Sequence, residues 1–200
     1  VDGLGNIQIT KKYYDNWSNK YDETLKKWNY TVPKKSINIL KNRLKDKPKI
    51  ILDLACGTGL FGDELIKIYK SSIIYGSDIS YKSLLIAKEK NIYKNLVKLN
   101  FETKKNYKKK FDLVSLIGAM TYCKNFNKFF SNIKFYLKQK GYFIFSHRTD
   151  LWEKQKFEKI LQEHRFDFKV IFLSRPQNYL PLNKDFTNKI KIRLVLLEKI

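Results

Sequence analysis

The sequence predicts an α/β fold in which a doubly wound, mostly parallel sheet of seven strands ends in an antiparallel hairpin. Short apolar runs typical of buried strands alternate with segments whose apolar residues recur at helical spacing. A turn with two glycines, Gly57 and Gly59, follows the first of these apolar runs. The last two expected strands are joined by a loop that contains Pro176 and Pro181, so they are expected to pair antiparallel.

Local patterns place the elements in order along the chain. A first helix is expected over 13–27, where aromatic side chains and Leu25 recur at helical spacing, and Pro33 opens a second helix that ends before Pro48. Strands are expected at 49–54, 73–77, 96–99, 111–117, 142–146, 168–173 and 189–198. Helices are expected at 61–69, 80–90, 125–137 and 151–164. Helices between parallel strands imply right-handed crossovers.

Composition restricts the class of protein. No apolar stretch approaches the roughly 18 residues that a membrane span needs, and the first ten residues lack the pattern of a secretory signal peptide. The chain has two cysteines, Cys56 and Cys123, which is no disulfide framework and fits a reducing compartment. We therefore expect a cytoplasmic protein without a membrane span.

The net charge of +22 allows two interpretations. A basic surface for nucleic acid or anionic lipid is one of them. The other is compositional bias, because only five of the 41 basic residues are arginine, the side chain that phosphate and base recognition favours. The densest lysine run, at 104–110, is expected in a loop. We favour a solvated surface and keep nucleic-acid binding as the alternative.

The glycine turn and a downstream acid predict a cofactor that contains adenosine. Without Cβ atoms at Gly57 and Gly59, the backbone lets a ligand approach closely. In open α/β sheets, ligands bind beyond the carboxyl ends of the strands, where this turn lies. Asp78 follows Gly59 by nineteen residues and ends the second strand, where its carboxylate can accept both hydroxyls of a ribose.

The same turn also fits a dinucleotide fingerprint, because Gly62 completes a GxGxxG pattern. Two features disfavour NAD. Asp53 stands four residues before Gly57, in a strand that dinucleotide folds usually keep apolar, and such a buried carboxylate needs a partner. The chain is also too short for a separate dehydrogenase substrate domain. An NAD-dependent oxidoreductase remains an alternative. Tyr136 and Lys140 form a Tyr-x-x-x-Lys pair, but such pairs arise by chance in a chain so rich in lysine.

Four segments resemble the motifs of class I S-adenosylmethionine-dependent methyltransferases, whose fold is Rossmann-like. They are residues 50–59, 73–80, 111–115 and 137–142. The entry segment from Tyr14 to Tyr30, with Pro33, is similar to a group that includes the TPR-associated predicted methyltransferases and the Williams–Beuren-region methyltransferase-like proteins. Arg148-Thr149 also resembles the latter. The resemblance implies S-adenosylmethionine as cofactor, S-adenosylhomocysteine as product, a helical cap at 1–48 and one compact methyltransferase domain at 49–200.

The resemblance also implies a set of cofactor-binding residues. Asp78 would hold the ribose and Ile79 would pack on the adenine. The methionine end would be lined by the turn residues Asp53, Ala55, Cys56, Gly57, Thr58 and Gly59. Asn100 stands where the family commonly has an Asp, and its side-chain carbonyl can still accept from the adenine amine. Phe101 would offer its backbone N–H, and Ile117 and Gly118 would lie under the cofactor.

Three further cofactor-binding residues, the candidate base and the substrate contacts are expected from chemistry and chain position. Tyr14, Trp17 and Tyr21 would close over the positive sulfonium, with plain helix packing as the alternative. His147 follows the fifth strand and is the candidate general base, although a lone histidine is commonly structural. Substrate contacts are expected from Tyr122 and Arg148. No cluster of residues has the spacing of a metal site.

The sequence thus predicts a methyltransferase that acts on a small-molecule acceptor. An RNA methyltransferase that uses the lysine-rich surface is an alternative, but residues 117–120 lack the Asn/Asp-Pro-Pro-aromatic stretch that accompanies methylation of base amines. A non-catalytic cofactor-binding partner subunit is the other alternative. The acceptor atom and the oligomeric state are not identified by the sequence.

Overall fold

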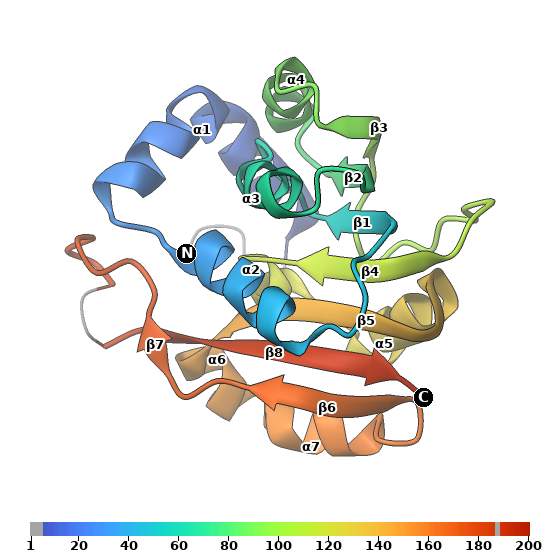
Figure 1. Ribbon diagram of the computed structural model, residues 1–200. Helices are drawn as coiled ribbons and strands as arrows, with labels where there is room; N and C mark the ends of the chain where they lie inside the picture. The colour runs from blue at the N-terminus through green and yellow to red at the C-terminus, as the bar shows by residue number, and fades with distance from the viewer. Residues whose placement is uncertain (1–5, 187–188) are drawn as a thin grey trace.

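The computed structural model describes residues 6–186 and 189–200, and in those ranges eight strands form one sheet (Figure 1). They are β1 (Ile50–Leu54), β2 (Ile73–Asp78), β3 (Tyr93–Lys98), β4 (Phe111–Leu116), β5 (Leu137–Arg148), β6 (Phe168–Leu173), β7 (Gln177–Asn178) and β8 (Lys191–Lys199). The order across the sheet is β3-β2-β1-β4-β5-β8-β6, and β7 pairs with β8. β1 to β5 run parallel, whereas β8 is antiparallel to its neighbours.

Helices cover both faces of this sheet, as doubly wound folds require (Figure 1). They are α1 (Ile7–Lys27), α2 (Val32–Arg43), α3 (Leu60–Ile68), α4 (Tyr81–Glu89), α5 (Phe126–Tyr136), α6 (Thr149–Lys154) and α7 (Phe157–Glu163), with a 3₁₀ turn at Met120–Tyr122. On one face, α2 and α3 pack their apolar side chains against Ile51, Ile74 and Leu113. On the other face, α5 and α7 bury phenylalanines against Phe143 and Phe145.

Short polar side chains fix where several helices begin. The Asn6 side chain accepts hydrogen bonds from the backbone of Gln8 and Ile9, so α1 starts at Ile7, six residues earlier than the aromatic spacing predicts. Ser80 caps α4 and Asn125 caps α5 in the same way. The Ser80 cap lies beside the carboxyl end of β2, because it follows that strand by two residues.

The predicted sheet is confirmed in type, with differences at its antiparallel side. β6 and β8 form the expected antiparallel pair at the sheet edge, with β8 next to β5 and β6 outermost. The two-residue strand β7 was not predicted. The helix expected at 151–164 is two helices, because Lys156 adopts a left-handed conformation with φ 50°. This break brings the rings of Trp152 and Phe157 within 4.8 Å of each other in the core.

Within the predicted cap at 1–48, the two helices have different roles. α1 lies beside the carboxyl ends of β1 and β4, at the left of Figure 1. In contrast, Ile37 and Leu40 of α2 pack into the core on the sheet face. Of the two helices, α1 therefore covers most of the end of the sheet where a ligand is expected, and α2 reaches it with Pro33 in its first turn. Residues 1–5 of the predicted cap lie outside the described residues, and the division at residue 48 stays a prediction.

Candidate cofactor and acceptor site

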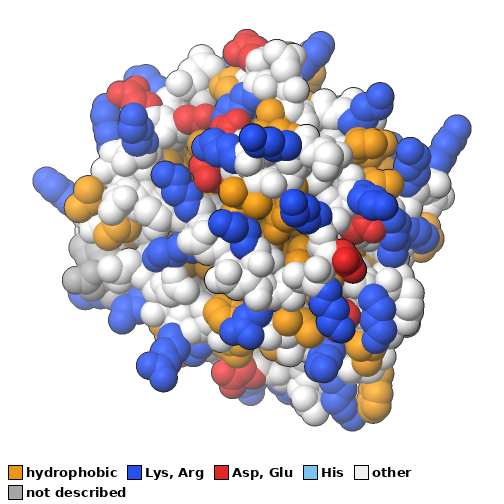
Figure 2. All heavy atoms as spheres, viewed as in Figure 1, with side chains coloured by type: hydrophobic (Ala, Val, Ile, Leu, Met, Phe, Trp, Pro, Cys, Tyr) orange, Lys and Arg blue, Asp and Glu red, His pale blue; other side chains and the backbone are white. Residues whose placement is uncertain are grey.

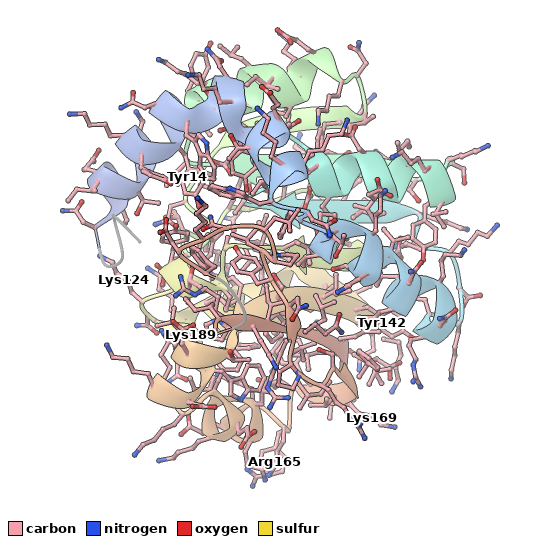
Figure 3. All side chains as sticks on the ribbon, turned by 90° about the vertical axis from the view of Figure 1, so that its left-hand side faces the viewer. Tyr14, Lys124, Tyr142, Arg165, Lys169 and Lys189 are labelled. Atoms are coloured by element: carbon pink, nitrogen blue, oxygen red, sulfur yellow. The ribbon has the colours of Figure 1, made fainter. Side chains whose placement is uncertain are left out.

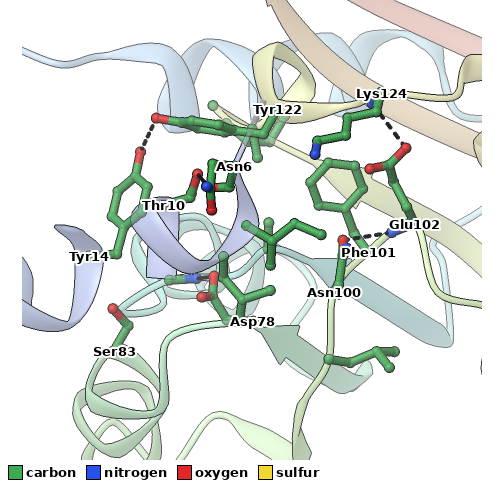
Figure 4. Close-up of a pocket in the computed structure, with 18 of the residues that line it drawn as sticks. Asn6, Thr10, Tyr14, Asp78, Ser83, Asn100, Phe101, Glu102, Tyr122 and Lys124 are labelled. Atoms are coloured by element: carbon green, nitrogen blue, oxygen red, sulfur yellow. Dashed lines mark hydrogen bonds between the residues drawn. The ribbon is translucent and has the colours of Figure 1, made fainter. Parts of the chain in front are cut away.

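The glycine turn after β1 places several residues in the left-handed region. Ala55 has φ 50°, Gly57 has φ 55° and Gly59 has φ 91°. A Cβ atom on Gly57 would have no protein atom within 4 Å, so it would project into open space rather than into packing. That space belongs to a cavity of about 800 Å³ lined by residues from the carboxyl ends of β1, β2, β3 and β4 together with α1, which we call the glycine-turn cavity (Figure 4).

Asp78 ends β2 and lines the glycine-turn cavity. Its carboxylate is 8% exposed and accepts hydrogen bonds from the backbone of Gly57 at 2.9 Å and of Ser80 at 2.8 Å. Burial raises the pKa of Asp78 from 3.8 to about 6. These backbone bonds fix the carboxylate beside the glycine turn, in a position where it can accept hydroxyl groups of a ligand.

Asp53 is the second buried carboxyl group at this end of the sheet. Its oxygens accept hydrogen bonds from the hydroxyls of Ser115, at 2.7 Å, and Tyr93, at 2.8 Å. Burial raises the pKa of Asp53 to about 6 as well. Together with Cys56 and Thr58, Asp53 lines a smaller hollow of about 360 Å³ under the turn. Gly62 packs against the ring of Tyr93 and lines neither the glycine-turn cavity nor this hollow. The absence of a side chain at residue 62 therefore allows α3 to pack closely against β3.

The far wall of the glycine-turn cavity is formed after β2 and β3 by Ile79, Leu99, Asn100 and Phe101. The Asn100 side-chain oxygen accepts a hydrogen bond from the backbone of Glu102 at 3.1 Å, which orients the amide at the cavity wall (Figure 4). This oxygen has a second lone pair and can accept a further donor. Phe101 is 7% exposed and packs edge-on against Phe129.

Helix α1 closes the cavity and is tied to the loops that form it. Asp15 accepts hydrogen bonds from the Ser80 hydroxyl at 2.7 Å and from the Lys82 backbone at 3.3 Å. Asp22 accepts a hydrogen bond from the Thr58 hydroxyl in the glycine turn. Lys90 lies 3.1 Å from Asp22 and 2.6 Å from Asp63. The contacts of α1 with the ends of β1 and β2 therefore run through two carboxylates.

A second cavity of about 1150 Å³ adjoins the glycine-turn cavity, and we call it the aromatic cavity. Its lining is Tyr13, Tyr14, Trp17, Tyr21, Leu25, Trp28, Tyr30, Gly118, Thr121, Tyr122, Arg148, Tyr179, Leu180, Asn183, Asp185 and Phe186. More than half of these side chains are aromatic. Tyr14, on the side of α1 that faces the body of the protein (Figure 3), donates to or accepts from the Tyr122 hydroxyl at 3.0 Å. Burial raises the pKa of the Tyr14 phenol.

The two cavities share a wall. Tyr14, Tyr21, Gly118 and Tyr122 line both of them. The backbone N–H of Gly118 donates to the Ser146 hydroxyl at 2.7 Å, which fixes this wall to the end of β5. A ligand in the glycine-turn cavity and a second one in the aromatic cavity would therefore meet at these four residues.

The structure brings most of the predicted site residues together. The glycine-turn cavity includes Tyr14, Tyr21, Ala55, Gly57, Asp78, Ile79, Asn100, Phe101, Ile117, Gly118 and Tyr122. Trp17 and Arg148 line the aromatic cavity instead. Gly59 lines neither of these two cavities and is the N-cap residue of α3. Sequence reasoning missed Asn6, Thr10, Ser83 and Glu102 on the first cavity. Of these, the helix-capping type of Asn6, just before an apolar periodic segment, was a readable signal.

The structure places His147 away from both cavities. It is fully buried, its Nε2 lies 2.9 Å from the Gln155 side chain, and its ring lies 4.7 Å from that of Phe157. Burial lowers the pKa of His147 to about 4. Side chains alternate along β5, so Arg148 lines the aromatic cavity and Ser146 contacts Gly118, whereas His147 packs near Trp152 of α6 and Phe157 of α7. A role as general base does not fit this placement.

The other predicted alternatives are also located. Tyr136 accepts a hydrogen bond from the Lys105 backbone and lines neither cavity, so the Tyr136–Lys140 pair is not part of this site. Across residues 6–186 and 189–200, no group of three His, Cys, Asp or Glu side chains is placed to hold a metal ion. In the same ranges, no helix is long and apolar enough to cross a membrane.

Comparison with known proteins adds evidence from sequence. A family model described as "Methyltransferase domain" matches residues 45–178. Human "Methyltransferase-like protein 27" is 29% identical over 123 residues, which cover 60% of this chain and 50% of that protein. The chain thus spans about half the length of this curated relative.

Solved structures share the fold at low identity. The N-methyltransferase NodS from Bradyrhizobium japonicum WM9, in complex with S-adenosylhomocysteine, is 13% identical with a TM-score of 0.64, and the match covers 83% of this chain and 86% of NodS. The plantazolicin methyltransferase BpumL, also in complex with S-adenosylhomocysteine, is 15% identical with a TM-score of 0.63 and coverage of 94% and 88%. These likenesses confirm the arrangement of strands and helices.

Proposed function

Because this chain belongs to the family of methyltransferase domains, we propose that it transfers a methyl group from S-adenosylmethionine to a small-molecule acceptor. The observation that carries the proposal is the shared wall between the glycine-turn cavity and the aromatic cavity. One cavity fits a cofactor with a ribose and an adenine, and the other fits an acceptor. Their common boundary is where a methyl group would pass between them.

S-adenosylmethionine is the cofactor, and when bound it supplies a methyl group on a positively charged sulfur. The open space at Gly57 and the buried carboxylate of Asp78 fit its ribose, and Asn100 and Phe101 fit its adenine. The faces of Tyr14 and Tyr21 at the shared wall suit a positive sulfonium. Methyl transfer is an in-line displacement, so these residues act mainly by alignment.

The aromatic cavity supports an acceptor that needs no protein base. Burial raises the pKa values of the lining phenols Tyr14, Tyr122 and Tyr179, so these groups stay protonated at neutral pH. The proposed acceptor is therefore a nucleophile that is ionised in its free form, or one that attacks through a neutral lone pair.

Calorimetric titration with S-adenosylmethionine, S-adenosylhomocysteine and NAD(H) tests the proposal. Micromolar binding of the first two, without binding of NAD(H), is expected. Binding of NAD(H) alone would overturn the methyltransferase assignment for this site. Binding of S-adenosylmethionine without turnover on broad panels of acceptors would instead favour the non-catalytic partner subunit.

The finer group remains a proposal. We place the chain with the TPR-associated and Williams–Beuren-region methyltransferase-like proteins, and the aromatic residues of α1 with Arg148-Thr149 support this placement. The human methyltransferase-like relative is consistent with it. We also propose a cytoplasmic location, because Cys56 and Cys123 form no disulfide framework and fit a reducing compartment.

RNA methylation is the competing function, and the charge of +22 favours it. Lysine and arginine side chains are spread widely over the face seen in Figure 2, with acidic and apolar groups between them. Such a spread is typical of a solvated surface. RNA binding that weakens steeply with salt would support the competing function, and a flat salt response would exclude it.

A further inference from the structure

We propose that the aromatic cavity binds a planar aromatic acid, whose carboxylate or phenolate oxygen is anchored by Arg148. The proposal rests on the proposed function, because it names the class of acceptor for the same site. It assigns the anchoring group and leaves the reacting atom open. Carboxylates and phenolates share the chemistry that Arg148 recognises, and the probes below separate a charged oxygen from a neutral one.

The walls of the aromatic cavity select a flat ring. On the α1 side, the rings of Trp17 and Trp28 lie 5.7 Å apart. In the segment 179–186, the ring centres of Tyr179 and Phe186 lie 5.7 Å apart. Aromatic side chains from two separate segments offer a ligand ring both stacked and edge-on contacts, which a flexible polar acceptor would not use. The acceptor is therefore expected to carry a planar aromatic body.

Arg148 supplies the one buried charge in this lining. The residue is 7% exposed, and its guanidinium carbon lies 5.1 Å from the centre of the Phe186 ring. Its Nε and Nη2 donate to Asp150 at 3.1 and 2.6 Å. Among the described residues, Nη1 donates to no protein group, so it is available to a ligand. An arginine beside an aromatic ring holds a carboxylate through its planar fork while the ring of the ligand stacks nearby.

The charge around the cavity favours an anion over a cation. Asp185, the other charged side chain of the lining, is exposed, whereas Arg148 is buried. The whole chain carries +22, and a positive field of this kind attracts anionic ligands and repels cationic ones. Aromatic walls alone would also accept a cation, so the buried arginine and the net charge decide the sign.

Three probes of one shape test the charge preference by titration calorimetry on the full chain, without cofactor and with saturating S-adenosylhomocysteine. The probes are 2-naphthoate, the neutral 2-naphthamide and the cation 2-naphthylmethylammonium. We expect 2-naphthoate to bind at least about tenfold more tightly than 2-naphthamide, since a charged hydrogen bond contributes about 1.5–3 kcal/mol. The cation is expected to bind most weakly.

Four variants assign that preference to Arg148. Arg148→Gln should bind 2-naphthoate and 2-naphthamide equally, and Arg148→Lys should keep part of the difference. Asp150→Asn should tighten 2-naphthoate several-fold, because it removes the internal carboxylate that competes for the guanidinium. Arg193→Gln is the matched control, since Arg193 lies beside the Trp152 ring and outside the aromatic cavity. It should leave all three affinities unchanged.

Equal affinity of wild type for 2-naphthoate and 2-naphthamide, tighter binding of the cation, or no binding of any probe would overturn the proposal. If Arg148→Gln does not fold by circular dichroism, the Asp150→Asn result decides, and an unchanged or weaker affinity for 2-naphthoate would count against it. Titration of S-adenosylhomocysteine on the same samples distinguishes a failure of the proposed function from a failure of the proposed acceptor class. If wild type does not bind S-adenosylhomocysteine, the proposed function is overturned. If it binds S-adenosylhomocysteine but shows no preference for 2-naphthoate, only the proposed class of acceptor is overturned.

Discussion

The two cavities of this protein are built in different ways. The glycine-turn cavity is formed largely by loops that follow β1, β2, β3 and β4, so many of its polar groups are fixed close to a strand end, and α1 closes it. The aromatic cavity joins α1 to residues 179–186 and to Arg148, which are far apart in the chain. The comparison teaches that the sheet determines the first cavity, whereas long-range packing determines the second.

The largest expected effect is the loss of cofactor binding in Asp78→Ala. The buried carboxylate accepts two backbone hydrogen bonds and, in the proposed complex, both ribose hydroxyls. Removing it should weaken S-adenosylhomocysteine by about 100-fold or more, since hydrogen bonds to charged groups contribute about 1.5–3 kcal/mol each. Titration calorimetry measures the change.

Asp112→Ala is the matched control for Asp78→Ala. The Asp112 carboxylate also accepts hydrogen bonds from two backbone groups, Lys49 and Ile50, but at the opposite end of the sheet. It should lose stability in thermal unfolding and keep its affinity for S-adenosylhomocysteine. Equal loss of affinity in both variants would mean that the Asp78 effect comes from the fold rather than from the cavity.

Two glycines of the same region should separate packing from ligand contact. A Cβ on Gly62 would lie 2.3 Å from the Tyr93 hydroxyl, so Gly62→Ala must displace the ring that donates to Asp53. We expect Gly62→Ala to cost about 1–3 kcal/mol of unfolding free energy and to change the affinity of the folded protein less than Gly57→Ala does.

Gly57→Ala tests the other half of this pair. Its Cβ would meet no protein atom, but the φ of 55° costs an alanine about 1–2 kcal/mol and the methyl group enters the glycine-turn cavity. Affinity for S-adenosylhomocysteine should therefore fall together with stability. Chemical unfolding and calorimetry on both variants give the two readouts. Unchanged affinity in Gly57→Ala would show that the ligand does not approach this turn.

The pH dependence of binding should follow Asp78. With a pKa of about 6, its ionised fraction rises about tenfold between pH 5 and pH 7, and only the carboxylate accepts both hydroxyls. Affinity for S-adenosylhomocysteine should rise by about the same factor, and Asp78→Asn should remove most of that rise. A flat profile for the wild-type protein would contradict the assigned role.

Stability is the poorer readout for this titration, because two signs compete. The raised pKa values of Asp53 and Asp78 mean that the folded chain binds more protons than the unfolded chain between about pH 4 and 6. The free energy of unfolding therefore falls as pH rises through that window. The lowered pKa of His147 has the opposite effect over about the same range, so stability rises with pH there. Ligand affinity avoids this cancellation.

The glycine-turn cavity could be predicted from the sequence, whereas much of the aromatic cavity could not. Residues of the glycine-turn cavity, such as Gly57, Asp78 and Asn100, were predictable because strand ends and turn chemistry are local features. Tyr179 and Phe186 were not, because no local pattern brings residues 179–186 to α1. The insertion of β8 between β5 and β6 is likewise a choice of pairing that element order leaves open.

The placement of His147 outside both cavities could have been expected from the sequence. Strand side chains alternate, so Ser146 and Arg148 cannot share a face with the residue between them. Once Arg148 was assigned to the substrate side, the period of two placed His147 on the opposite face. Counting the strand to its end at Arg148, rather than stopping at Ser146, would have given that result.

The smallest expected effect concerns α1, the element that both cavities share. Asp15→Ala removes the acceptor for the Ser80 hydroxyl and the Lys82 backbone, which hold α1 to the loop after β2. Each such bond contributes about 0.5–1.5 kcal/mol, so affinity for S-adenosylhomocysteine should fall about threefold and proteolytic cleavage within α1 should become faster. Glu23→Ala is the control on the same helix, because Glu23 is exposed and pairs only with Lys27 among the described residues. If Asp15→Ala and Glu23→Ala behave alike, the hydrogen bonds of Asp15 do not contribute to cofactor affinity.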